Sequence, residues 1–125
     1  MDKKSQVMER SETKTFDNPD EVREFPKGIL ELIHVGGRVI GKATLQPGWR
    51  WSESVKPIAK TESCQAPHLQ YHISGLLHIV CDDGTELECG PGDVSSLSSG
   101  HDAWVVGEEP AVIVDFQGMV EYAKK

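Results

Sequence analysis

The fold is decided by the stretch LQYHISGLLHIVCDDGTELECGPGDVSSL, residues 69–97. It contains four short runs rich in apolar and β-branched residues, and glycine-containing turn sequences separate them. These turns are Ser74-Gly75, Asp83-Gly84 and Gly90-Pro91-Gly92-Asp93. Short runs bounded by glycine, proline and aspartate are typical of antiparallel β-strands. The stretch therefore predicts four strands joined by tight turns.

Further strands are expected on both sides of this stretch, at residues 29–35, 38–43, 103–106 and 111–116. A two-residue turn at Gly36-Gly37 would join the first two of them. That turn would pair Ile33 with Ile40 and Glu31 with Lys42, and both pairs are chemically compatible. Many short strands without alternating helices predict an all-β fold. A double-sheet jelly roll is the leading architecture, and an up-and-down barrel is the alternative.

A chain of 125 residues predicts one domain. We expect the β-barrel over residues 28–117, a polar segment over residues 1–27 and a tail over residues 118–125. In the polar segment, Asn18 can cap a helix, Pro19 suits the first helical position and Glu21 can complete a capping box. A short N-terminal helix is therefore predicted.

The charge of the chain excludes several classes of partner. Lys and Arg number 13 against 20 Asp and Glu, which gives a net charge of −7. Nucleic-acid binders usually carry a basic patch, and the sequence has no Lys/Arg cluster. The same acidic balance disfavours anionic membrane surfaces, and no apolar run approaches the roughly 20 residues that span a bilayer. We therefore expect neither nucleic acid nor a membrane as a partner.

Two of the three cysteines, Cys81 and Cys89, flank Asp83-Gly84. A two-residue turn there would place Cys81 opposite Glu86 and Cys89 opposite His78. The two sulfur atoms would then be offset by about 10 Å along the strands, which is too far for a disulfide. Reduced thiols and the absence of an apolar leader at the N-terminus predict a cytoplasmic protein.

Residues 68–73 alternate three polar residues, His68, Gln70 and His72, with three apolar ones. Because a strand alternates its faces, the polar residues share one face. That face is either solvated or lines the interior of the barrel. His68 and His72 would lie about 13 Å apart, so they are expected to be separate pocket residues rather than a chelating pair. His101, which follows Gly100 at the start of a strand, forms a second polar position.

Several of these motifs together resemble the cupin superfamily. The resemblance is carried by Pro47-Gly48, His68, Ile73-Ser74-Gly75, Asp83-Gly84, Gly90-Pro91-Gly92-Asp93-Val94, Gly100-His101 and Trp104. The two cupin motifs would span residues 56–106, within a similarity that extends over about residues 28–117. The resemblance implies a double-stranded β-helix, which is a jelly roll.

The first cupin motif usually supplies His-x-His, then three or four residues, then Glu. Counted back from Gly75, these positions fall on Glu62, Cys64 and His68, and the histidine of the second motif falls on His101. The resemblance therefore implies that Glu62, Cys64, His68 and His101 are metal ligands. Their donor types suit a divalent transition metal such as Zn, Fe, Ni or Mn.

We hypothesise a single-domain cupin that binds a small molecule, with or without a metal. Gln70, His72, Trp51 and Trp104 would contact the ligand, since both tryptophans lie beside loops at the expected open end. The alternative is a metal-dependent dioxygenase, isomerase or decarboxylase of a small polar substrate, with Glu62 or His72 as general base. A non-catalytic oligomerisation module is a third hypothesis. A homodimer is expected in each case.

Overall fold

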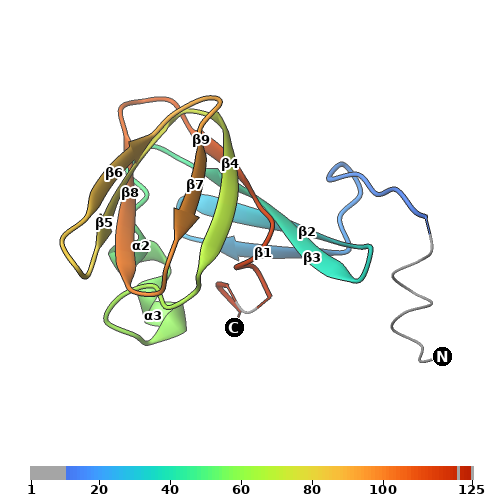
Figure 1. The fold of residues 1–125 in the computed structure, drawn as a ribbon, viewed down its shortest axis with the longest axis horizontal. Coiled ribbons are helices and arrows are strands. Elements are labelled where there is room, and N and C mark those ends of the chain that lie inside the picture. Colours follow the sequence, from blue (N-terminus) through green and yellow to red (C-terminus); the bar gives the residue numbers. More distant parts are fainter. Residues whose placement is uncertain (1–10, 121, 125) are drawn as a thin grey trace.

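The computed structural model describes residues 11–120 and 122–124, and it consists of two antiparallel sheets and two short helices (Figure 1). One sheet has the strand order β1-β2-β3-β9-β4-β7 and the other the order β6-β5-β8. The elements are β1 Glu21–Phe25, β2 Gly28–Val35, β3 Arg38–Leu45, α2 Trp51–Ser54, α3 Lys56–Ala59, β4 His68–Ser74, β5 Leu76–Cys81, β6 Glu86–Cys89, β7 Val94–Leu97, β8 His101–Val106 and β9 Ala111–Asp115.

The apolar core lies between the two sheets. Leu30 and Leu32 from β2 and Ile113 from β9 are buried together with Leu77 and Ile79 from β5. The sheets keep open edges at β1, β7, β6 and β8, so the predicted barrel is not closed. The prediction of an all-β, antiparallel fold is confirmed.

The predicted β2–β3 hairpin has the expected register. Ile33 lies opposite Ile40 and Glu31 lies opposite Lys42. Gly36 and Gly37 both have positive φ, at 59° and 73°. A two-residue hairpin turn of this kind needs positive φ at both positions, which glycine adopts without a steric penalty.

The predicted N-terminal helix is wrong for the described residues, because residues 21–25 form strand β1 instead. β1 pairs with β2 along its whole length and buries Phe25 at its end. The capping signal at Asn18 is a weak local preference, whereas pairing satisfies the hydrogen bonds of an otherwise open β2 edge. Residues 1–10 of the predicted polar segment lie outside the described residues.

The β5–β6 hairpin differs from its predicted register by one residue. Cys89 lies opposite Leu77 rather than His78, and the backbone N–H of Cys81 donates to Thr85. The loop therefore contains three residues, 82–84, with Gly84 at a φ of 93°. A three-residue loop with a left-handed glycine is the next most common hairpin connection after the two-residue turn. All three cysteines are free thiols.

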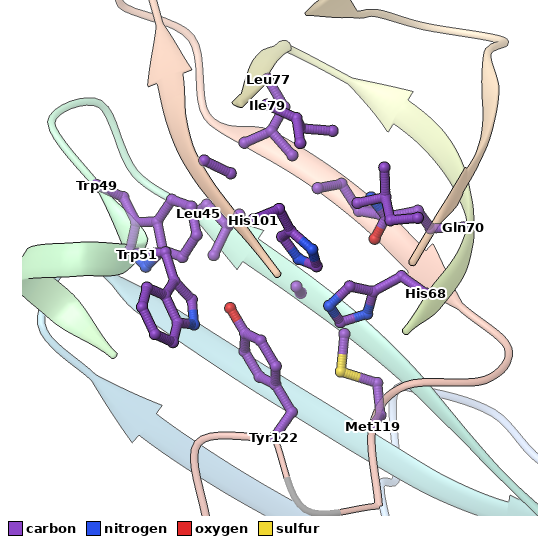
Figure 2. A pocket seen from close by; sticks show the side chains of 14 residues that line it. Leu45, Trp49, Trp51, His68, Gln70, Leu77, Ile79, His101, Met119 and Tyr122 are labelled. Carbon is purple, nitrogen blue, oxygen red and sulfur yellow. The ribbon is translucent and has the colours of Figure 1, made fainter. Parts of the chain in front are cut away.

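The connection between β3 and β4, expected to be a loop, contains the short helices α2 and α3. α2 buries Trp51, and the backbone of Trp49 just before it accepts a hydrogen bond from Val105 in β8. These contacts place both tryptophans in the wall of a cavity between the sheets (Figure 2). Within the described residues, neither helix has the length and hydrophobicity to cross a bilayer.

Candidate metal centre

Strand β4 turns its polar side chains into the protein and its apolar side chains outward. His68, Gln70 and His72 are buried, whereas the apolar residues between them keep 42–44% of their surface exposed. This arrangement is the reverse of an ordinary half-buried strand. The polar face of β4 therefore lines the interior rather than the solvent.

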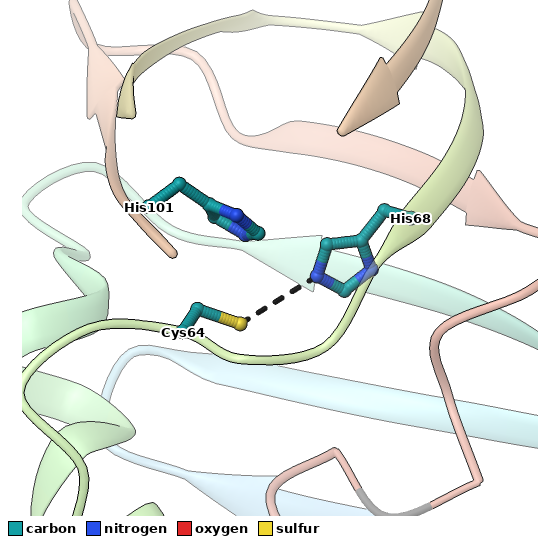
Figure 3. A group of neighbouring side chains, drawn as sticks. All are labelled: Cys64, His68 and His101. Atoms are coloured by element: carbon teal, nitrogen blue, oxygen red, sulfur yellow. Dashed lines mark hydrogen bonds between the residues drawn. The ribbon is translucent and has the colours of Figure 1, made fainter. Parts of the chain in front are cut away.

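Three of these interior and neighbouring side chains converge at one end of the core. The donor atoms of Cys64, His68 and His101 all lie within 4.8 Å of one another, and all three residues are buried (Figure 3). The Cys64 Sγ atom lies 3.6 Å from His68 Nε2, and the ring centroids of His68 and His101 are 5.1 Å apart.

Backbone pairing brings these residues together. His68 and His101 are the first residues of β4 and β8. Cys64 forms an isolated bridge with His101: its backbone N–H donates to the His101 carbonyl at 2.7 Å. The N–H of Gly100 donates to the Cys64 carbonyl, also at 2.7 Å. The position of the thiol is thus set by main-chain hydrogen bonds.

Each imidazole has its Nδ1 atom engaged by the protein, so Nε2 is the nitrogen that could ligate a metal. The fully buried Asp115 at the end of β9 accepts a hydrogen bond from His68 Nδ1 through its Oδ2 atom. Its other carboxylate oxygen accepts from the backbone N–H groups of Gln117 and Gly118 at 2.8 and 2.9 Å. His101 Nδ1 donates to the Ser98 carbonyl at 3.1 Å. Such partners are typical of histidines that ligate metals through the opposite nitrogen.

The cluster carries paired opposite charges. Burial alone favours a neutral Cys64 thiol, but hydrogen bonds with His101 and His68 outweigh it and lower the pKa of Cys64 to about 6. Burial alone opposes a charged His68, but hydrogen bonds with Asp115 and Cys64 raise the pKa of His68 to about 9. Burial also opposes the charged Asp115, yet its bond with His68 lowers the pKa of the carboxyl. These shifts favour a Cys64 thiolate paired with a charged His68 at neutral pH.

These donors fit a divalent transition metal. Zinc–sulfur and zinc–nitrogen bonds of about 2.3 and 2.0 Å at a tetrahedral angle separate the two ligand atoms by roughly 3.5 Å. The distance between Cys64 Sγ and His68 Nε2 is close to this value. One thiolate and two imidazoles supply three ligands, and a cavity of about 40 Å³ lies beside both histidines.

Solved structures show which fold this arrangement belongs to. KdgF from Halomonas sp. is 14% identical over 89% of this chain and 97% of its own, with a TM-score of 0.60. Ectoine synthase from P. lautus is 12% identical over 87% of this chain and 80% of its own, with a TM-score of 0.60. A cupin-like protein from Thermotoga maritima is 11% identical over 75% of this chain and 70% of its own, with a TM-score of 0.52.

The chain has the cupin fold. No family model matches the sequence of this chain, and no curated protein matches it either. At these identities the likeness concerns the fold alone, so the roles of the residues must be argued from the site itself.

The structure brings together three of the four residues that the sequence resemblance implies as ligands. Glu62 is the exception, because its side chain is 98% exposed and pairs with Lys56 at 3.1 Å. The bridge between Cys64 and His101 holds Cys64 inside, while the chain two residues earlier lies at the surface. The structure therefore does not support Glu62 as a ligand.

Two of the four predicted ligand-binding residues line the cavity, namely Gln70 and Trp51 (Figure 2). His72 is 1% exposed and bonds to Ser95 Oγ at 2.8 Å, and it is not among the described residues that line the cavity. Trp104 lies elsewhere: its ring stacks on His78 at 4.7 Å and lies under the guanidinium of Arg50 at 4.2 Å.

Sequence reasoning missed four residues of the site. Asp115 orients His68, and Trp49, Met119 and Tyr122 line the cavity. The one local signal was a lone carboxylate at the end of the apolar run 111–114. A buried carboxylate needs a partner, and a buried histidine is a suitable one. Met119 and Tyr122 lie in the expected C-terminal tail, where no motif marks them.

Proposed function

We propose that this protein is a jelly-roll cupin that binds a divalent transition metal through Cys64, His68 and His101. A small-molecule ligand would occupy the position that the three protein ligands leave open. The observation that carries the proposal is the convergence of three buried donors within 4.8 Å of one another. Both histidines already have their Nδ1 atoms engaged, so their remaining nitrogens are oriented toward a common point.

The donor set favours some metals over others. A thiolate is a soft ligand that suits Zn²⁺ and Fe, whereas Mn²⁺, Mg²⁺ and Ca²⁺ prefer oxygen ligands. Because Glu62 lies outside the cluster, no carboxylate of the described residues is placed to ligate directly. We therefore expect Zn²⁺ to bind most tightly, with Fe²⁺ or Ni²⁺ as competitors.

A metal-dependent enzyme is the second candidate function. Catalytic zinc sites keep three protein ligands and one open position, whereas structural sites use four. A metal at such a site can polarise a bound oxygen or lower the pKa of a bound water. The Glu62 side chain is too exposed to act as a general base in the cavity. Burial lowers the pKa of His72, and its ring is hydrogen-bonded to Ser95 outside the cavity lining, so His72 is not placed to act as the base either. Tyr122 and Gln70 are the polar side chains of the cavity available for this chemistry.

Metal analysis of the purified protein tests the proposal. We expect about one equivalent of a transition metal after incubation with Zn²⁺ and desalting. Cys64→Ala and His101→Ala should each retain well below one equivalent, while circular dichroism shows that the fold is kept. Cys81→Ala is the matched control, because Cys81 is a free cysteine outside the cluster. Equal metal content in wild type and Cys64→Ala would refute the proposal.

Turnover separates the two candidate functions. The metal-loaded protein is incubated with a ligand that it binds, and NMR follows the ligand over hours. A ligand that stays chemically unchanged identifies a binding protein. Conversion that disappears in His101→Ala and persists in Cys81→Ala would identify an enzyme.

A further inference from the structure

Two hollows border the candidate metal centre. The inner cavity of about 40 Å³ is lined by His68 and His101, and an outer groove of about 510 Å³ is lined by Cys64. Trp51 and Tyr122 line both hollows. These two aromatic side chains therefore form the partition between the groove and the cavity.

The inner cavity is too small to hold a whole ligand. A volume of 40 Å³ accommodates the centres of about three water molecules at most. Sites for small molecules usually measure about 300–1,000 Å³, and the outer groove lies in that range. The groove walls are mostly apolar and include Val55, Ile58, Pro67 and Val120.

The partition places a polar group beside the metal centre. The ring of Tyr122 packs edge-on against His68, with centroids 5.7 Å apart, and its hydroxyl points into the inner cavity (Figure 2). Burial raises the pKa of Tyr122 well above its usual value, so the hydroxyl keeps its proton and can donate. Trp49 lines the same cavity, and its Nε1 atom is buried without a partner among the described residues. The Tyr122 hydroxyl, as a donor at the cavity, favours an oxygen acceptor as its occupant.

Arg23 of β1 anchors the main chain at three described residues of this segment. Arg23 of β1 donates to the carbonyl oxygens of Met119, Val120 and Tyr122 at 3.1, 3.0 and 2.7 Å. A ligand that passes from the groove into the cavity must therefore contact the Tyr122 side chain, which lines both.

We propose that the outer groove binds the apolar body of a carboxylate ligand whose head passes Tyr122 to reach the metal centre. This inference rests on the proposed function, since the head needs the metal at Cys64, His68 and His101. The ligand class is an amphiphilic acid, with an apolar chain or ring in the groove and a carboxylate that accepts from the Tyr122 hydroxyl. A small polar substrate would leave the groove unfilled.

Binding of three probes to the Zn²⁺-loaded protein tests the inference. Isothermal titration calorimetry should show octanoate binding at least about tenfold more tightly than acetate, because acetate lacks the apolar body, and than octan-1-ol, because the alcohol lacks the anionic head. Tyr122→Phe keeps the partition and removes the donor, so it should weaken octanoate binding about three- to tenfold while the metal content stays unchanged.

A groove variant and its control complete the test. Val120→Glu places a charge in the groove at a residue that is 53% exposed, so it should weaken octanoate binding and leave acetate binding unchanged. Val94→Glu, at a residue 67% exposed on β7 and outside the groove lining, should change neither. Equal affinities for octanoate and acetate in metal-loaded protein would overturn the groove inference and leave the metal centre standing. Loss of the metal centre itself is detected separately, as absence of bound metal in the same wild-type samples.

Discussion

Asp115 and His68 form a hydrogen-bonded carboxylate–imidazole pair in the buried interior, and this pair directs His68 Nε2 toward Cys64. Asp115 belongs to β9 and His68 to β4, which are neighbouring strands of the larger sheet. Two backbone N–H groups donate to the Asp115 carboxylate, so the main chain fixes the orientation of the carboxylate. The pairing of β4 with β9 thus holds the two side chains next to each other.

Replacing Asp115 with asparagine should weaken metal binding about 10- to 100-fold, the usual effect of removing such a partner. The amide can still accept from His68 Nδ1, but it no longer increases the electron-donating strength of the imidazole as a metal ligand. Competition with a chromophoric chelator measures the affinity, and the spectrum of the Co²⁺-substituted protein reports the ligand geometry. Asp17→Asn, at an exposed aspartate, is the control. Unchanged affinity in Asp115→Asn would show that the pair does not support metal binding.

Metal affinity should rise with pH between about 6 and 9. In this range Cys64 is already a thiolate, but His68 carries a proton that the metal must displace, because its pKa is raised to about 9. One displaced proton gives roughly a tenfold gain in affinity per pH unit, and the gain ends above the pKa of His68. Below about pH 6 the thiol also holds a proton, so the slope should steepen. Affinity that is independent of pH from 6 to 9 would contradict this assignment.

Gly75 should tolerate no side chain. Its φ is +74°, and a Cβ atom there would overlap the carbonyl oxygen of Pro110. Gly75→Ala should therefore lower the free energy of unfolding by more than the roughly 1–2 kcal/mol of a left-handed residue alone. Gly36→Ala, at a φ of +59° with no atom within 4 Å, should show only the conformational cost. Urea denaturation compares the two, and equal losses would contradict the predicted overlap.

A homodimer remains a prediction, and the structure suggests the face to test. Leu69, Tyr71 and Ile73 form an exposed apolar strip on the outer side of β4, and exposed apolar strips of this kind often mark interfaces. Sedimentation should show a dimer for the wild type, and Tyr71→Glu should shift it toward monomer without loss of bound metal. A wild type that stays monomeric at high concentration would refute the prediction.

The features of the fold that could be predicted are those that depend on residues close together in the sequence. The β2–β3 register followed from Gly36-Gly37, because the turn type sets which residues face each other. The β5–β6 register was wrong by one because the same reasoning assumed a two-residue loop, whereas the loop holds three residues. β1 was not predicted, because the capping pattern at Asn18 indicated a helix. The strand forms because it pairs with the edge of β2, and this pairing is not visible in the local sequence.

The residues of the candidate site also fall into two groups, those that local sequence could predict and those that depend on contacts between distant segments. Cys64, His68 and His101 could be found from motif spacing, whereas Asp115 reaches His68 only through the pairing of β4 with β9, across 47 positions of sequence. The carbonyl oxygen of Tyr122 accepts a hydrogen bond from Arg23 of β1, which lies 99 positions earlier in the sequence. No local pattern encodes either lateral contact, so sequence alone could not place these two residues.

The inverted polarity of β4 places it in conflict with the hydrophobic effect. A slip of one residue in its pairing would exchange three buried polar side chains for three apolar ones, which by burial alone would favour the slipped strand. The Asp115–His68 and Ser95–His72 hydrogen bonds, together with the bulge between His72 and Ser74, oppose that exchange. Stabilisation by apolar substitutions on the inner face of β4 would thus replace His68 itself and remove one of the three donors beside Cys64.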